Sequence, residues 1–163
     1  PDKILLVNPG SFAIGDNEAT ILPPLGLMYI ATALNKCGFK AQVYDADLAK
    51  ETPDEAMAAI KKISPRVVGV RVHYYHLNWT KELVSKIREY DNSVIVGAGG
   101  PIASYSPQVI IKRIGLDFAI SGEGESPMKS LAQNLKNGHA YYKDVPGITA
   151  RHPEGGHYSA SLL

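Results

Sequence analysis

The residues of this sequence that could take part in chemistry lie in short polar segments that follow apolar runs. His73 and His76 flank two tyrosines and could reach a metal ion or serve as acid and base. Neither histidine has an acidic or cysteine partner at matched spacing, which favours polar loop residues over ligands. Glu123 and Glu125 form a carboxylate pair, but both precede an expected helix, where negative charge is stabilising. We therefore predict no catalytic residue and no protein metal ligand in this chain.

Glycine is the more informative residue type in these segments, of which there are five. Three of them contain glycine, which lets a ligand approach main-chain N–H groups with no Cβ in the way. Tight turns also use glycine routinely, so a single glycine-rich segment is not specific. Their joint occurrence favours a bulky ligand that lies against the backbone. The five segments are 8–11, 45–47, 71–74, 97–101 and 121–125.

The common nucleotide and phosphate motifs are absent from these segments. A dinucleotide fingerprint needs G-x-G-x-x-G directly after the first strand, where this sequence has N-P-G-S-F-A-I-G. The sequence contains no G-x-x-x-x-G-K-[ST] phosphate loop, which argues against nucleoside triphosphate chemistry. A phosphoacceptor receiver would need acidic residues where Asn8 and Arg71 stand.

The segments must be positioned by five strands that alternate with five helices. Short apolar runs predict buried strands, and apolar residues at helical spacing after Ser, Thr, Asn or Pro predict helices. This alternation predicts an α/β fold, a doubly wound five-stranded parallel sheet that is flavodoxin-like with order 2-1-3-4-5. The expected strands are 3–8, 40–44, 67–72, 93–96 and 116–120, and the expected helix starts are Pro23-Pro24, Thr52-Pro53, Asn78, Ser106-Pro107 and Ser126-Pro127.

The expected topology also predicts where a ligand would bind. Ligands of open parallel sheets lie outside the carboxyl ends of the strands where strand order reverses, which here is between the first and third strands. Residues 147–152 and 157–160, separated by P-E-G-G, predict a hairpin at the C-terminal edge. We expect 1–163 to form a single domain, with an α/β core over about 1–140 and a C-terminal extension over 141–163.

Composition indicates an ordinary globular domain. The 163 residues include 17 Lys and Arg and 16 Asp and Glu, a formal charge of +1, so no nucleic acid and no membrane partner is expected. The apolar runs fall well short of the roughly 20 residues that span a bilayer, and no leader is recognisable. Cys37 is the only cysteine, which excludes an internal disulfide and fits a cytoplasmic protein. This thiol closes the apolar stripe of the first helix and is expected to be buried.

Six short motifs occur together in a combination that is more specific than any of them alone. They are K-I-L-L-V-N-P (3–9), P-P-L-G-L (23–27), C-G-F (37–39), V-Y-D-A (43–46), V-G-A-G-G-P (96–101) and I-S-G-E-G-E (120–125). In this order and at these separations they resemble the N-terminal cobalamin (B12)-binding domain of B12-dependent radical SAM enzymes, including the magnesium-protoporphyrin IX monomethyl ester oxidative cyclase type. The resemblance spans nearly the whole chain.

The resemblance implies that cobalamin is the cofactor. Its corrin ring would lie across the carboxyl edge of the sheet, with the nucleotide tail beside strands 1, 3 and 4 and the tail phosphate on the backbone of Gly97, Gly99 and Gly100. The implied cofactor-binding residues are Asn8, Pro9, Gly10, Leu25, Gly26, Arg71, Val72, His73, Tyr74, Gly97, Gly99, Gly100, Pro101, Gly122, Glu123 and Gly124.

One motif of related cobalamin domains is missing. Domains of the methionine-synthase type carry D-x-H-x-x-G after the first strand, and its histidine coordinates cobalt. Residues 8–15 contain no histidine, so cobalamin is expected to bind without that ligand. Whether His73, His76, Tyr74 or a water approaches the lower face of cobalt stays open.

The resemblance also implies a partner in cis. Such enzymes hold a 4Fe-4S cluster and S-adenosylmethionine in a separate radical SAM domain with C-x-x-x-C-x-x-C, which this chain lacks. The chain alone is therefore not expected to be an enzyme, whereas the full-length protein is expected to be a B12-dependent methyltransferase or oxidative cyclase.

Two other hypotheses remain open. A cofactor-free flavodoxin-like protein-interaction module would keep the fold and dock a partner on the same edge. A flavin or other nucleotide binder is disfavoured, because the loop after the first strand lacks a phosphate cradle of hydroxyl and glycine.

Overall fold

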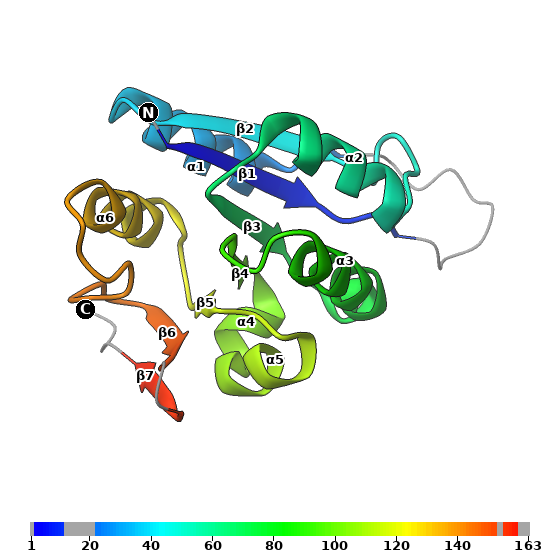
Figure 1. Cartoon of the computed structure of the whole chain (residues 1–163). Coiled ribbons are helices and arrows are strands. Elements are labelled where there is room, and N and C mark those ends of the chain that lie inside the picture. The colour runs from blue at the N-terminus through cyan, green and yellow to red at the C-terminus, as the bar shows by residue number, and fades with distance from the viewer. Residues whose placement is uncertain (1, 12–21, 153–154, 160–163) are drawn as a thin grey trace.

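The computed structural model describes residues 2–11, 22–152 and 155–159, which form a seven-stranded sheet with helices on both faces (Figure 1). The strands run in the order β2-β1-β3-β4-β5-β6-β7. The first five are parallel, and β6 and β7 extend the sheet as an antiparallel hairpin. The predicted order and the C-terminal hairpin are thus confirmed. The strands are β1 (Lys3–Asn8), β2 (Lys40–Asp45), β3 (Val67–Arg71), β4 (Ile95–Gly99), β5 (Phe118–Ile120), β6 (Ile148–Arg151) and β7 (His157–Ser159).

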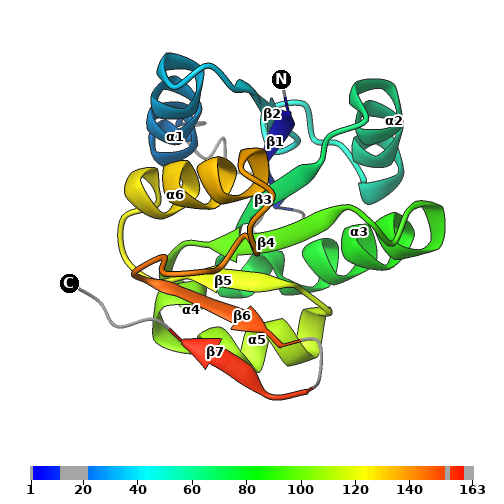
Figure 2. The same cartoon turned by 60° about the vertical axis from the view of Figure 1, so that its left-hand side comes forward.

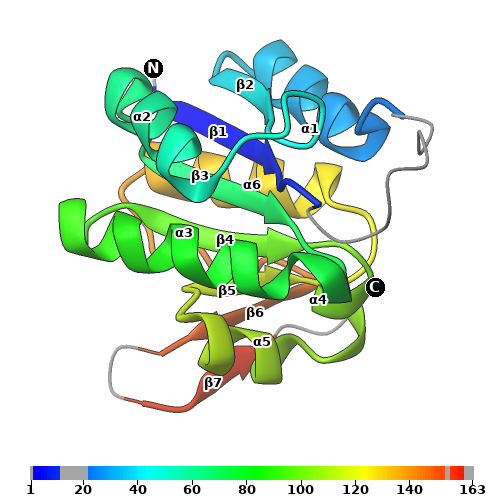
Figure 3. The same ribbon diagram turned by 90° about the vertical axis from the view of Figure 1, so that its right-hand side faces the viewer.

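Helices cover the two faces of the sheet in separate sets. Figure 2 shows α1 and α6 side by side on one face, and Figure 3 shows α2, α3 and α5 on the other, with the arrows of β1, β3 and β4 pointing to the same edge. Two buried apolar clusters fill the two layers. The helices are α1 (Leu25–Lys36), α2 (Pro53–Ile63), α3 (Leu77–Tyr90), α4 (Pro101–Tyr105), α5 (Pro107–Ile114), α6 (Glu125–Lys136) and the 3-10 turn η1 (Tyr74–His76).

The start of α2 is as the sequence predicts. The Thr52 side chain accepts a hydrogen bond from the Glu55 backbone N–H, and the Glu55 carboxylate accepts one from the Thr52 backbone N–H at 2.7 Å. This capping box satisfies two N–H groups that would otherwise lack partners. Hydrogen bonds from the Thr52 backbone and then its side chain lower the pKa of Glu55.

The predicted start of α5 at Ser106-Pro107 is confirmed, whereas α3 and α6 each begin one residue before the predicted cap. The chain after β3 first forms η1, whose last residue precedes α3, so this helix starts before Asn78. Ser106 makes no capping hydrogen bond to α5, and α6 begins at Glu125, one residue before Ser126. Helix ends vary by one or two residues, so local propensity does not define the starts of α3 and α6 to the residue.

Two further differences concern α4 and Cys37. No helix was predicted at α4, which begins at Pro101 directly after the turn at Gly100. Cys37 was expected to be buried but is exposed, because α1 ends at Lys36 and Cys37 lies in the turn that follows the helix.

Candidate ligand-binding site

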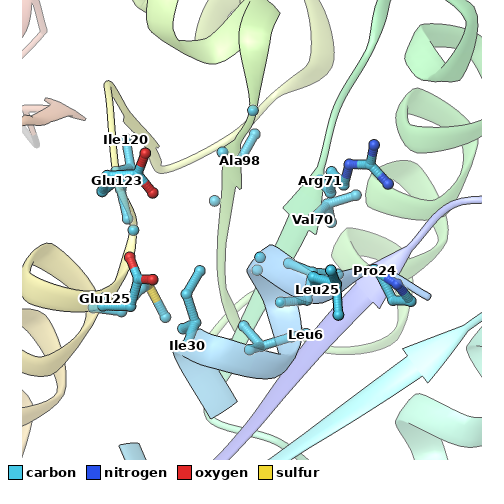
Figure 4. Close-up of a pocket in the computed structure, with 18 of the residues that line it drawn as sticks. Leu6, Pro24, Leu25, Ile30, Val70, Arg71, Ala98, Ile120, Glu123 and Glu125 are labelled. Atoms are coloured by element: carbon cyan, nitrogen blue, oxygen red, sulfur yellow. The ribbon is translucent and has the colours of Figure 1, made fainter. Parts of the chain in front are cut away.

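A cavity opens at the carboxyl edge of the parallel sheet, between α1 and α6 (Figure 4). Its volume is about 490 Å³, within the range of about 300–1,000 Å³ that is typical of small-molecule sites. Strands β1, β3, β4 and β5 form its floor, the start of α1 forms one wall, and the loop from β5 into α6 forms the other. The cavity therefore lies at the reversal of strand order where a ligand is expected.

Three glycines of the central strands lower the floor of this cavity. Side chains of a strand alternate between the two faces of a sheet, and these glycines stand at every second position on the face under α1 and α6. Gly69 of β3 pairs with Gly97 of β4, and Gly99 is the register partner of Arg71. Because no Cβ rises from the sheet at these glycines, a trough runs along β3 and β4.

The trough is open at one end and covered at the other. A Cβ built at Gly99 would have no atom within 4 Å, whereas one at Gly69 would lie 3.0 Å from Leu6 Cδ2 and one at Gly97 would overlap the ring of Phe118. The Phe118 side chain is buried. The space above Gly99 is therefore available to a ligand, whereas Gly97 is required because the Phe118 ring packs over it.

Small and apolar residues make up the walls. Gly26, in the first turn of α1, faces space that is open to 4 Å. A Cβ at Gly124 would lie 2.6 Å from Ile30 Cδ1, so the loop into α6 can contact α1 only because residue 124 has no side chain. Leu25 and Met128 also line the cavity. A flat, largely apolar group fits between such walls.

Gly100 has a structural role beside the cavity. Its φ of +103° turns the chain from β4 into α4, and a Cβ there would lie 3.1 Å from the carbonyl oxygen of Val72. Only glycine adopts this conformation without strain. The buried Val72 in turn donates its backbone N–H to the carbonyl oxygen of Gly99 at 2.8 Å. These contacts fix the edge of the sheet next to the open end of the trough.

A row of polar side chains joins the ends of β2, β1 and β3. Asn8 Nδ2 donates to Asp45 Oδ1 at 2.8 Å, and Arg71 donates to Asn8 Oδ1 at 3.3 Å. A second nitrogen of Arg71 lies 3.0 Å from Nε2 of His73. Asn8 is 3% exposed, so its amide is committed to these neighbours. The row holds Arg71, the one cationic side chain among the described residues that line the cavity.

The pKa values of the two histidines after β3 are lowered, which favours their neutral forms. Burial lowers the pKa of His76 to about 4, and the charges of His73 and Arg71 act in the same direction. Burial, and then the charge of Arg71, also lowers the pKa of His73. The His73 backbone N–H donates to Nδ1 of His76 at 3.3 Å, and the ring of His73 stacks on Tyr75 with centroids 5.2 Å apart. These contacts favour a structural packing role for His73 and His76 over a role as an acid–base pair.

Two kinds of feature are absent from the part of the chain that the structure describes. Over residues 2–11, 22–152 and 155–159, no three His, Cys, Asp or Glu side chains are grouped so that they could hold a metal ion. In the same ranges no helix has the length and apolar character needed to cross a membrane.

The structure brings together more than half of the predicted site residues. Those that line the cavity are Leu25, Gly26, Arg71, Gly97, Gly99, Gly100, Gly122, Glu123 and Gly124. The other predicted residues lie beside it at the strand ends and do not line it. They are Asn8, Pro9, Gly10, Val72, His73, Tyr74 and Pro101.

Sequence reasoning missed most of the apolar lining. Leu6 stands two residues before Asn8, and Gly69 stands two residues before Arg71, so each pair lies on the same face of the sheet. The alternation of side chains along a strand predicts this placement from the sequence. The lining from the two helices and β5 follows only from the tertiary structure. The missed residues are Leu6, Leu22, Pro23, Pro24, Leu27, Ile30, Gly69, Val70, Ala98, Phe118, Ile120, Glu125 and Met128.

Known proteins are similar to this chain in sequence and in backbone. The model of a family described as the B12 binding domain matches residues 13–132. The chain is 28% identical over 148 residues to an uncharacterized methyltransferase of Pyrococcus horikoshii. This match covers 90% of this chain and 31% of that protein. It is 29% identical over 160 residues to the anaerobic magnesium-protoporphyrin IX monomethyl ester cyclase of Synechocystis sp. This match covers 93% of this chain and 31% of that protein.

A solved structure shows the same fold. The radical S-adenosylmethionine methyltransferase TsrM from Kitasatospora setae, determined with cobalamin and a [4Fe-4S] cluster bound, superposes with a TM-score of 0.82 at 22% identity. The match covers 99% of this chain and 29% of that chain. The present chain thus spans about a third of the length of each of these proteins.

Proposed function

This chain belongs to the B12-binding domain family, as its motifs predicted, and on that premise we propose that it holds cobalamin across the carboxyl edge of its sheet. The observation that carries this proposal is the trough between α1 and α6, which is open above Gly99 and beside Gly26. A buried slot of this kind suits the nucleotide tail of the ligand, while the corrin ring would lie over the strand ends.

The residues present fit such a ligand. The apolar walls match the flat base of the tail, and the glycines leave the main chain accessible without a Cβ in the way. We propose that Gly26 and Gly99 flank the base, that Gly100 and Gly122 approach the tail, and that Gly97 serves mainly the packing of Phe118. The predicted residues at the strand ends, from Asn8 to Gly10 and from Val72 to Tyr74, would then lie under the ring.

The chemistry of the bound state divides between the ligand and the chain. Cobalamin, when bound, supplies methyl transfer or radical chemistry at its cobalt. The residues of this chain bind and orient: the row Asp45, Asn8, Arg71 and His73 holds one side of the edge in fixed geometry. Burial keeps the His76 imidazole uncharged near neutral pH, so this side chain adds no positive charge beside β3.

We further propose that this module serves a radical SAM catalytic domain in a longer cytoplasmic protein. Chain length supports this, since the module accounts for about a third of each related protein. In that protein the 4Fe-4S cluster and S-adenosylmethionine would belong to the downstream domain, and residues 141–163 would lead into it. The activity of the whole protein would then be a methyl transfer or an oxidative cyclisation.

Binding of hydroxocobalamin tests the proposed function directly. The purified chain is incubated with hydroxocobalamin under oxidising and under reducing conditions, desalted and examined by absorption spectroscopy. We expect corrin absorbance to elute with the protein at a ratio near one. Complete loss of the colour on desalting, with the protein folded by circular dichroism, would contradict the proposal and favour the cofactor-free interaction module.

A further inference from the structure

β2 lies at one edge of the sheet and, in the part of the chain that the structure describes, has a neighbouring strand on its β1 side only (Figure 1). Along a strand, the main-chain N–H and C=O groups of successive residues point alternately to its two sides. Every second residue of an edge strand therefore directs both groups away from the sheet. A row of such unpaired groups can pair with a strand of another molecule, and proteins protect their edge strands against this pairing.

Hydrogen bonds to β1 show which residues of β2 face inward. The Lys40 N–H donates to the Asp2 carbonyl oxygen at 3.3 Å. Directly after the strand, the Ala46 N–H donates to the Asn8 carbonyl oxygen at 3.0 Å. Alternation along the strand then directs the main-chain groups of every second residue between these two ends outward. The outward-facing residues are Ala41, Val43 and Asp45.

The outward groups of Ala41 are occupied by a side chain of the same molecule. Asn35 lies in the last turn of α1, where its Oδ1 accepts from the Ala41 N–H at 2.9 Å and its Nδ2 donates to the Ala41 carbonyl oxygen at 3.0 Å. A side-chain amide carries the same C=O and N–H groups as a peptide bond. Asn35 therefore satisfies both groups of Ala41 as a residue of a neighbouring strand would.

Burial agrees with this arrangement. Ala41 is only 7% exposed although it stands on an edge strand, whereas Asn35 is exposed. The outward N–H and C=O groups of Val43 have no hydrogen-bond partner among the described residues. The open part of the edge is therefore limited to residues 43–45.

A second copy of this chain is the partner that an unprotected β2 edge would fit. Two β2 strands related by a two-fold axis at Val43 run antiparallel, and outward-facing residues then form hydrogen-bonded pairs with outward-facing residues. Val43 would pair with its own copy, and Ala41 of each molecule would pair with Asp45 of the other. Ala41 therefore belongs to every pair except the central one, and Asn35 blocks each pair to which Ala41 belongs.

We propose that Asn35 prevents two copies of this chain from pairing through their β2 edges. Its side-chain amide takes the place of a neighbouring strand at Ala41 and leaves an open edge too short to hold two molecules together. The inference does not depend on the proposed function, because Asn35 lies in the last turn of α1 and the cavity is lined by residues of its first half.

Asn35→Ala tests the proposal through the state of association. Sedimentation velocity over a wide range of protein concentration measures the dissociation constant of the dimer for this variant and for the unsubstituted chain. Each net hydrogen bond changes an equilibrium constant by about 2- to 10-fold. We therefore expect the variant, with the groups of Ala41 released, to form dimers with a dissociation constant about 10- to 100-fold lower.

Asn134→Ala is a matched control on the other helix of the same face. Asn134 lies in the last turn of α6, and its Nδ2 donates to the carbonyl oxygens of Tyr141 and Lys143 at 3.3 and 2.8 Å. Both acceptors lie outside the strands. Each alanine variant loses two hydrogen bonds at a helix end and should melt about 2–8 °C lower. Only Asn35→Ala exposes a strand edge, so Asn134→Ala should associate no more than the unsubstituted chain.

A second substitution tests whether the association uses β2. Val43→Pro removes the outward N–H at the centre of the paired edges and spares the hydrogen bonds to β1, a position at which an edge strand tolerates proline. Added to Asn35→Ala, it should restore the monomer. A monomeric Asn35→Ala variant, equal association of the two alanine variants, or dimers that persist in the double variant would each overturn the proposal.

Amide hydrogen exchange of the unsubstituted chain gives a result even if Asn35→Ala fails to fold. The Ala41 N–H donates to Asn35, whereas the Val43 N–H has no partner among the described residues. We expect the Ala41 amide to exchange at least about 10-fold more slowly than the Val43 amide. Equally fast exchange of the two amides would show that Asn35 does not occupy the edge and would overturn the proposal.

Discussion

Gly99→Val tests the position of the ligand most directly, because the structure predicts that it changes binding without changing the fold. A Cβ at Gly99 has no atom within 4 Å, and its φ is not positive. Valine is also favoured in strands. We therefore expect the melting temperature to change by less than the roughly 2–4 °C that 1 kcal/mol produces in a chain of this size.

The expected loss of affinity follows from the space that the new side chain takes. Valine adds three carbons at the open end of the trough, where the nucleotide tail is proposed to lie. Overfilling a packed site costs about 1–3 kcal/mol, which corresponds to about 5- to 150-fold in dissociation constant. Gly99→Ala adds a single carbon and should fall at the lower end of this range.

Absorbance titration with hydroxocobalamin, together with a thermal melt, measures both quantities. Ala58→Val is a suitable control, since it adds bulk to an exposed position of α2 on the opposite face of the sheet. Gly100→Val is unsuitable because the φ of +103° at Gly100 would strain any other residue. An unchanged dissociation constant for a normally folded Gly99→Val protein would refute the placement of the tail.

Three other substitutions test features of the fold around the site. Gly97→Ala places a methyl group against the ring of Phe118 and should lower the free energy of unfolding, measured with urea, by about 1–3 kcal/mol. Adding Phe118→Leu to this variant should restore part of the loss. An unchanged urea midpoint for Gly97→Ala would contradict this packing. Thr52→Ala removes the hydroxyl that caps α2 and should cost about 1 kcal/mol in the same assay, whereas no loss would mean that the Glu55 half of the capping box suffices. The pKa of His76 falls from 6.5 to about 4 on folding. As pH falls through this interval, His76 of the unfolded chain is protonated before His76 of the folded chain. The free energy of unfolding should therefore decline, by at most about 3 kcal/mol. His76→Gln should flatten this part of the pH profile, and parallel profiles for the two proteins would show that another group is responsible.

The sequence predicts most of the fold because strand runs and crossovers follow local rules. β-branched runs such as Val67–Arg71 mark buried strands, and the alternation with helices implies the parallel order. The prediction for β4 ended too early, at Val96, since the glycines and alanine that follow have low strand propensity. Pairing of β4 with β3 and β5 extends it to Gly99, an effect of tertiary contacts that single-sequence propensity does not carry.

The site is predictable in its location and only partly in its residues. Reversal of strand order points to the correct edge, and the glycines of 97–100 and 122–124 do line the cavity. Phe118, by contrast, is indistinguishable from a core residue in the sequence, and the approach of Ile30 to Gly124 joins segments far apart in the chain. Such contacts depend on how the two helices pack, which periodicity does not reveal.

The walls of the cavity come from α1 and α6, which are encoded about a hundred residues apart in the chain. During synthesis, the first strands and α1 emerge from the ribosome well before the second wall exists. A corrinoid therefore finds no complete slot on a nascent chain until α6 has emerged and docked. Ligand binding would then follow the docking of α6, and it would stabilise only the fully folded molecules, by mass action.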